Sequence, residues 1–183
     1  MIYKVIIAFF FSNILFSQEC TIQKNEYGLG EVGVEEIKCM AKNYNGYTLI
    51  YTFGLWCEPC IVHLDTLFKI TEEYSLNLGI IVIDKNESNF AYSKTFLESK
   101  KKNVNVLSIK DSYGKRANKQ YKIFLTEITP EKFLNIGGMS KYILLNNKGE
   151  VLMVTNWKDG LEGENWRNDM PMLKRKIIPI LEQ

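Results

Sequence analysis

Two cysteines three positions apart, between a strand-like run and a helix-like run, constrain this chain more than any other feature. The run from Tyr47 to Phe53 is rich in β-branched and aromatic residues and contains no Gly or Pro, which is typical of a buried strand. After Cys60 an apolar face recurs at helical spacing, at Ile61, Leu64, Leu67, Phe68 and Ile70. A second apolar run follows at residues 78–83. The sequence therefore predicts that Cys57 and Cys60 lie at the first turn of a β–α–β crossover.

Thiols at this spacing can close a small disulfide and reopen it. A helix N-terminus presents unpaired N–H groups and a positive dipole end, so we expect Cys57 to ionise readily and to be the attacking sulfur. Cys60, one turn further along, is then the resolving thiol. Pro59 suits a first turn because its missing N–H would have no partner there. Unless it points into water, Glu58 opposes thiolate formation, which favours a reductant or mild exchanger over a strong oxidant.

A half zinc site or a static disulfide is the alternative interpretation of the cysteine pair. Structural zinc needs four ligands, and the remaining candidates are Cys20, Cys39 and His63, with no second Cys-x-x-Cys. Redox chemistry is therefore the favoured interpretation, and no metal site is predicted.

Two segments resemble a known family. The run from Leu49 to Cys60 is similar to the active-site segment of thioredoxin-fold proteins of the TlpA/ResA type, which are extracytoplasmic thiol-disulfide oxidoreductases. The run from Ser140 to Val151 resembles the strand–turn–strand that follows the active-site cis-proline of that family. The resemblance covers about residues 44–155. It implies an α/β thioredoxin-like fold, with a central mixed β-sheet flanked by helices.

The resemblance also implies an activity. The chain is expected to be a thiol-disulfide oxidoreductase without a cofactor, acting on protein disulfide or dithiol substrates and recharged by an upstream thiol reductant or oxidant protein. The quartet Cys57-Glu-Pro-Cys60 matches reductants of cytochrome c maturation, which suggests apocytochrome haem-binding cysteines as one substrate. Two alternatives stay open: a thioredoxin-fold copper or zinc chaperone, and an interaction protein whose disulfide is redox-inactive.

The sequence departs from the family at the expected substrate groove, which we assign to Trp56, Pro59, Met139 and Ser140. Ser140 stands where the family has the cis-proline that shapes the groove and discourages metal capture. A cis peptide before serine would cost about 3 kcal/mol, so we expect a trans bond.

The helix after Cys60 shows a second departure, since His63 and Asp65 stand where relatives carry a carboxylate and a proline. His63 is a candidate proton donor and acceptor for thiol exchange, while the alternative is an exposed helix histidine. Without the kink-forming proline, the helix from Pro59 to about Tyr74 is expected to run straighter.

The N-terminus predicts export. Residues 1–17 contain one lysine, an apolar core of about twelve residues and a small residue, Ser17, which is typical of a cleaved secretory signal. A membrane span needs roughly twenty apolar residues, and no lipoprotein pattern precedes Cys20, so no stable membrane anchor is expected. An uncleaved anchor is the alternative. Residues 18–183 then form one exported thioredoxin-like domain, periplasmic or extracytoplasmic.

Charge and cysteine count complete the picture. The net charge is +2 with acids and bases interspersed, so no nucleic-acid partner is expected.

The two cysteines outside the active pair, Cys20 and Cys39, are expected to form a structural disulfide that ties down the mature N-terminus. The alternative is that one of them is free or exchanges with the active pair.

The rest of the chain predicts alternating elements: helices at 88–101, at 111–121 with Asp111 as cap and after a cap at Asp169, a strand at 104–109, and a hairpin of 142–145 with 151–155. Residues 122–139 are predicted to be an insertion near the active site, with a helical turn starting at Thr129-Pro130-Glu131. This insertion either covers the disulfide or packs beside the sheet. Trp157 and Trp166 are expected to complete a core.

Overall fold

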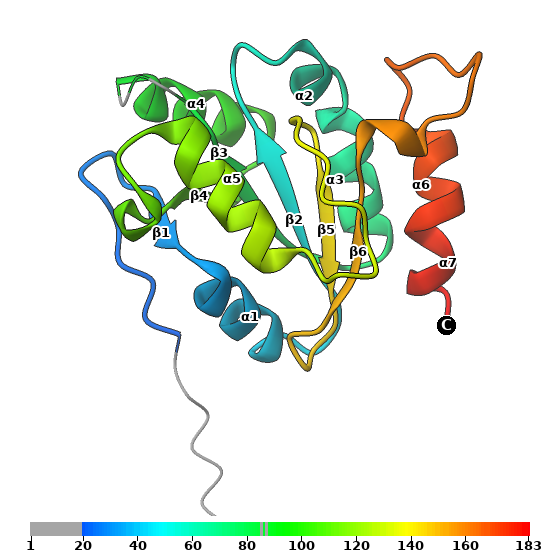
Figure 1. Cartoon of the computed structure of the whole chain (residues 1–183), viewed down its shortest axis with the longest axis horizontal. Helices are drawn as coiled ribbons and strands as arrows, with labels where there is room; N and C mark the ends of the chain where they lie inside the picture. The colour runs from blue at the N-terminus through cyan, green and yellow to red at the C-terminus, as the bar shows by residue number, and fades with distance from the viewer. Residues whose placement is uncertain (1–19, 85, 87) are drawn as a thin grey trace, which may run out of the picture.

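The computed structural model describes residues 20–84, 86 and 88–183. Within them, six strands form one mixed sheet in the order β1-β4-β3-β2-β5-β6 (Figure 1). The strands are β1 (Gly30–Val32), β2 (Thr48–Phe53), β3 (Asn77–Val82), β4 (Asn105–Ile109), β5 (Tyr142–Leu145) and β6 (Val151–Val154). Strands β1 to β4 pair in parallel, and β5 and β6 add in antiparallel orientation. The secretory signal predicted at residues 1–17 lies outside the described residues.

Helices cover both faces of this sheet, as the two apolar clusters show. One face is covered by α2 (Glu58–Val62), α3 (Leu64–Glu73), α4 (Ser88–Lys100) and α6 (Met170–Lys176). The opposite face is covered by α1 (Val34–Lys42) and α5 (Ala117–Ile128). The short elements are η1 (Asp111–Tyr113), η2 (Trp157–Asp159) and α7 (Ile178–Leu181). The predicted α/β class with a central mixed sheet flanked by helices is therefore confirmed.

Strand β2 lies in the middle of the sheet, and all six of its residues are buried. Leu49, Tyr51 and Phe53 face the cluster under α2 and α3, whereas Ile50 faces the cluster under α1 and α5. A strand covered on both faces is expected to be a nearly continuous apolar run, which is the pattern seen from Tyr47 to Phe53. The chain leaves this strand directly toward Cys57.

The helix predicted at 111–121 is displaced along the chain. Residues Asp111–Tyr113 form only a short 3-10 turn, and Gly114 then adopts a φ of +120°, which ends it. Helix α5 begins at Ala117 and buries Tyr121, Phe124, Leu125 and Ile128 at helical spacing. Residues 122–128 of the predicted insertion are therefore helical. Thr129-Pro130-Glu131 starts no helix, and the Phe133 N–H instead closes a turn onto the Pro130 carbonyl at 2.9 Å.

The helix predicted from Pro59 to about Tyr74, expected to run straighter than in relatives, is not continuous, because it is interrupted at His63 between α2 and α3. The Tyr51 hydroxyl donates to the Cys60 carbonyl at 3.3 Å. In an uninterrupted helix that carbonyl would accept from Leu64. A side chain that enters the helical hydrogen-bond ladder is a known cause of breaks, so a proline is not needed here.

The N-terminal segment of the described chain is joined to α1 by a Cys20–Cys39 disulfide, with a Cα–Cα distance of 5.8 Å. Among the residues that the structure describes, no helix has the length and apolar content that crossing a membrane requires.

Candidate active site

A tight turn carries the chain from β2 to the two cysteines. The Cys57 N–H donates to the Gly54 carbonyl at 3.0 Å. The Trp56 indole folds back over the turn, and its Nε1 donates to the Ile83 carbonyl at 3.3 Å. A Cβ at Gly54 would lie 2.9 Å from that indole nitrogen, so only glycine allows the ring to pack here. The turn thereby fixes Cys57 at the carboxyl end of the central strand.

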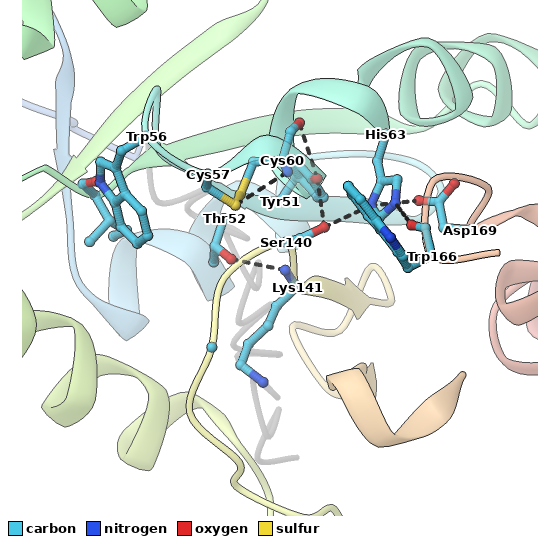
Figure 2. The surroundings of a disulfide bond; sticks show 12 residues. Tyr51, Thr52, Trp56, Cys57, Cys60, His63, Ser140, Lys141, Trp166 and Asp169 are labelled. Atoms are coloured by element: carbon cyan, nitrogen blue, oxygen red, sulfur yellow. Dashed lines mark hydrogen bonds and ion pairs between the residues drawn. A yellow bond between two sulfur atoms is a disulfide. The ribbon is translucent and has the colours of Figure 1, made fainter. Parts of the chain in front are cut away.

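Cys57 and Cys60 form a disulfide at the N-terminus of α2, with a Cα–Cα distance of 5.2 Å (Figure 2). Cys57 is the N-cap residue of α2, and its Sγ accepts a hydrogen bond from the Cys60 N–H at 3.2 Å. Cys57 is 7% exposed, whereas Cys60 is completely buried. An N–H donor aimed at Sγ favours a thiolate over a thiol, since only the anion gains a charge-assisted bond. The geometry therefore gives the two sulfurs unequal surroundings.

Glu58 does not point freely into water. Its carboxylate pairs with the Arg167 guanidinium, and both side chains are more than half exposed. Arg167 also lies over the Trp166 ring, 4.6 Å from the centroid. The cation offsets the negative charge that Glu58 places beside the cysteines. Sequence reasoning missed Arg167, because nothing near it in the chain connects it to the active-site helix.

Ser140 directly precedes the residue before β5, where the sequence resemblance led us to expect a change from cis-proline to serine. Among the described residues there is no cis peptide bond, as expected for the bond before Ser140. Ser140 has a φ of +62°, which is uncommon for a residue with a side chain. Its N–H donates to the Thr52 carbonyl at 3.2 Å, and its Oγ lies 2.9 Å from the Tyr51 hydroxyl. Ser140 is thus held against the central strand by backbone and side chain together.

His63 is buried, at 8% exposure, so the alternative of an exposed helix histidine is wrong. Its Nε2 lies 2.7 Å from the Trp166 carbonyl, and its Nδ1 lies 2.8 Å from Ser140 Oγ. A carbonyl oxygen only accepts, so Nε2 carries a proton and donates. In the neutral ring Nδ1 then accepts from the Ser140 hydroxyl. Ser140 Oγ in turn accepts from the Tyr51 hydroxyl, whose single proton is shared with the Cys60 carbonyl. His63 therefore bridges the active-site helix, the segment before β5 and the C-terminal loop.

Asp169 is the second buried partner of His63. Its Oδ2 lies 3.4 Å from His63 Nδ1 and also accepts from the Tyr142 hydroxyl. The side chain is 5% exposed, and Oδ1 has no hydrogen-bond partner among the described residues. Asp169 is the N-cap residue of α6, as predicted, but its side chain makes no capping hydrogen bond to that helix. Because a carboxylate is common at a helix cap, nothing in the sequence indicated that the Asp169 side chain is buried.

The cluster of Asp169, His63 and Ser140 does not have the geometry of a hydrolytic triad. In such a triad the carboxylate and the hydroxyl contact opposite ring nitrogens, whereas here both lie at Nδ1 (Figure 2). Burial raises the pKa values of Tyr51 and Tyr142, and the neighbouring Tyr51 and Asp169 also raise that of Tyr142. Both phenols therefore stay neutral near neutral pH and act as hydrogen-bond donors.

The predicted groove residues do not all lie together. Pro59, Met139 and Ser140 line a cavity on the His63 side of the disulfide. Trp56 lies on the other side of the disulfide (Figure 2). Trp157 and Trp166 line the same cavity and are 71% and 50% exposed, so the expectation that they complete a core is wrong. They sit in irregular and 3-10 segments outside both apolar clusters.

Metal ligands do not gather at this site in the part of the chain that the structure describes, where no group of three His, Cys, Asp or Glu side chains is placed to hold an ion. Cys20 and Cys39 are joined to each other and not to the active pair.

Comparison with solved structures identifies the fold. An uncharacterised thioredoxin-like protein from Porphyromonas gingivalis superposes with a TM-score of 0.51, at 15% identity, over 76% of this chain and 78% of that chain. The thioredoxin domain of a thiol-disulfide oxidoreductase from Bacteroides vulgatus gives 0.48 at 15% identity over 85% and 92%. StoA from Bacillus subtilis gives 0.44 at 18% identity over 74% and 85%. No family model and no curated protein matches the sequence.

The first of these similarities shows a thioredoxin-like fold, and the two with lower scores add nothing to that assignment. The chain is therefore a thioredoxin-like α/β protein with a Cys-x-x-Cys disulfide at the start of a helix.

Proposed function

We propose that this protein is an exported thiol-disulfide oxidoreductase of the TlpA/ResA type that exchanges disulfides with protein substrates through Cys57 and Cys60. The observation that supports it best is the asymmetry of the pair. Cys57 caps the helix, receives an N–H hydrogen bond on its sulfur and keeps some exposure, whereas Cys60 is buried behind it. An attacking sulfur must be reachable and easily ionised, and a resolving sulfur need only reach its neighbour.

In the reducing direction, the Cys57 thiolate attacks one sulfur of a client disulfide. A Cys57–client disulfide forms, the client S–S bond breaks, and the other client sulfur leaves as a thiolate that takes up a proton. The Cys60 thiol then loses its proton and attacks Cys57 Sγ. This second step releases the remaining client thiol and forms the Cys57–Cys60 disulfide, so that two electrons have passed to the client. An upstream thiol protein must reduce the pair again.

His63 is the candidate proton acceptor for the Cys60 thiol in this scheme. It lies one turn beyond Cys60, and histidine is the side-chain type that most readily exchanges protons near neutral pH. His63 bonds to Ser140 Oγ at 2.8 Å, and Ser140 Oγ lies 2.9 Å from the Tyr51 hydroxyl. The Tyr51 hydroxyl contacts the Cys60 carbonyl, so these polar groups connect His63 to Cys60. The Trp166 carbonyl holds the ring as a positioning partner, and the Asp169 carboxylate near Nδ1 stabilises the imidazolium once Nδ1 takes up the proton.

The proposal also covers the direction of electron flow and the identity of the client protein. We propose a reductant, with oxidised haem-binding cysteines of apocytochromes as one client, on the basis of the Cys57-Glu-Pro-Cys60 quartet. Arg167 pairs with Glu58 and offsets its charge, so Glu58 opposes formation of the Cys57 thiolate only weakly. Export through a signal at residues 1–17 completes the proposal.

Reduction of insulin by the mature chain in the presence of dithiothreitol tests the activity. We expect Cys57→Ser to abolish the catalysed reaction, and Cys60→Ser to accumulate a mixed disulfide between Cys57 and insulin that mass spectrometry detects. The matched control is the double substitution of Cys20 and Cys39 to serine, assayed at a temperature at which this variant is folded. It should stay active. A rate that survives Cys57→Ser would overturn the proposal.

A further inference from the structure

A cavity of about 380 Å³ is lined in part by Pro59, His63 and Ser140. Figure 2 shows Ser140 and His63 on one side of the disulfide. Its volume is within the range of ligand pockets in proteins. The remaining walls come mostly from residues 155–172, the segment that follows the last strand of the sheet. The large apolar side chains among the lining residues are Met139, Trp157, Leu161, Trp166 and Met172.

The mouth of this cavity exposes an unusual amount of apolar surface. Trp157, Leu161 and Trp166 are each at least half exposed. Lys158 Nζ lies 5.4 Å from the Trp157 ring centroid, and Arg167 lies over Trp166, so each indole has a cation against it. Clustered exposed apolar side chains at a cavity mark a binding surface more often than they mark chance exposure.

The buried polar groups at the cavity are already partnered or sealed. His63 bonds to Trp166 and Ser140, and the Tyr142 hydroxyl donates to Asp169. The unpartnered Asp169 Oδ1 is shielded from solvent and so offers no contact to a ligand. The ions at the rim are paired as Arg167–Glu58, Arg175–Glu164 and Lys176–Asp159. Lys158 lies against the Trp157 ring instead of a carboxylate. Among the described residues the apolar side chains thus offer the largest open contact, and we take apolar contact as the basis for recognition.

The wall of the cavity is tied to the active-site helix at two points. The Trp166 carbonyl accepts from His63 Nε2 at 2.7 Å, and the next residue, Arg167, pairs with Glu58. Glu58 lies between the two cysteines in sequence, and His63 follows Cys60 by three residues. An occupant of the cavity therefore lies at a defined place relative to the disulfide.

We propose that this cavity binds one large apolar or aromatic side chain of the client polypeptide, close in sequence to the client cysteine that reacts with Cys57. The proposal rests on the proposed function, and it adds a substrate class to it. A client sulfur bonded to Cys57 brings its neighbouring residues past Pro59 and Ser140, which are part of the cavity lining. A polypeptide is therefore the occupant that the position of the cavity favours over a free small molecule.

Short peptides test this inference. Each peptide contains one cysteine, which forms a mixed disulfide with glutathione. The peptides are made in pairs that differ at one of the two positions on either side of this cysteine, where one peptide has phenylalanine and the other has alanine. The rate constant for oxidation of the reduced mature chain is measured for each. At one or more positions we expect the phenylalanine peptide to react about tenfold faster than its alanine counterpart, because burial of one large apolar side chain supplies an effect of that size.

Two glycines provide a matched pair of variants. Gly160 lines the cavity, and a Cβ added there would meet nothing closer than 3.8 Å. Gly137 lies outside the cavity lining and has nothing within 4 Å of an added Cβ. We expect Gly160→Leu to reduce the phenylalanine-to-alanine ratio toward one, and Gly137→Leu to leave it at about tenfold.

A ratio near one in the unmodified protein would overturn the cavity proposal, as would a tenfold ratio that persists in Gly160→Leu. In both results the chain still exchanges with every peptide, so the proposed function stands. If no peptide and no oxidised glutathione reacts with the reduced chain, the proposed function fails, and the client proposal fails with it.

Discussion

His63 is the residue on which three separate segments of the chain converge. It contacts Ser140 before β5 and both Trp166 and Asp169 in the C-terminal segment. His63 itself is buried, so removing the imidazole leaves its hydrogen bonds to the Trp166 carbonyl and the Ser140 hydroxyl unmade and a void in their place, and both cost energy in the folded state.

His63→Ala is therefore predicted to lower the free energy of unfolding by about 1–3 kcal/mol, measured by urea denaturation. Lys69→Ala is the matched control, since Lys69 is exposed on α3 and its loss should change stability by less than about 0.5 kcal/mol. Equal stability of the two variants would show that the His63 contacts contribute nothing.

Ser140 combines a left-handed backbone with a bonded side chain, and two substitutions separate these effects. Ser140→Ala and Ser140→Gly both remove the hydroxyl that bonds to His63 and Tyr51. Only glycine relieves the strain of a φ near +62°. We predict that Ser140→Gly is about 1 kcal/mol more stable than Ser140→Ala in chemical denaturation. If the alanine variant is the more stable, the backbone conformation assigned to Ser140 is wrong.

At the scale of elements, much of the arrangement could be predicted from the sequence. The apolar runs at 47–53 and 78–83 predicted strands β2 and β3, and the cysteine pair predicted a helix that begins next to Cys57. These predictions succeed because apolar periodicity and helix-capping signals are local. The break at His63 and the burial of Asp169 could not be predicted in this way. Each depends on a hydroxyl from another element, Tyr51 in β2 and Tyr142 in β5, and sequence spacing contains no information on which elements meet.

The Cys20–Cys39 disulfide joins the segment before β1 to helix α1 across a sequence separation of 19 residues. A cross-link of this length restricts the unfolded chain, so it is predicted to contribute about 3 kcal/mol. The double serine variant should unfold at correspondingly lower urea concentration while its Cys57–Cys60 chemistry is retained. A variant as stable as the parent protein would show that the N-terminal segment is held by its other contacts alone.

At the scale of the whole molecule, buried tyrosines make stability depend on alkaline pH. Burial raises the pKa values of Tyr51, Tyr121 and Tyr142, whereas an unfolded tyrosine titrates near pH 10. Above about pH 10 the unfolded state binds fewer protons than the folded state, so the free energy of unfolding falls as pH rises. Desolvation lowers the pKa of Lys141, which changes stability in the opposite sense. Lys141 is a single group, whereas three buried tyrosines contribute to the decline.

Urea denaturation between about pH 8 and 11 should show this decline. Tyr121→Phe is predicted to make the decline shallower, because it removes one proton that only the folded state retains. Tyr92→Phe is the control, since Tyr92 is 69% exposed and meets solvent in both states. A slope that is the same in both variants and in the parent would refute a role for buried tyrosine.

The central claim is that Cys57 and Cys60 form a reversible redox couple in a thioredoxin-like fold. Its most direct test is a titration of the mature chain across dithiothreitol buffers of known potential, with the thiols trapped and resolved by mass. The account predicts one two-electron transition for Cys57–Cys60 near the thioredoxin range of about −270 mV, with Cys20–Cys39 still oxidised at that potential. A value near about −120 mV would contradict the assignment as a reductant, and the absence of any reversible transition would contradict the oxidoreductase itself.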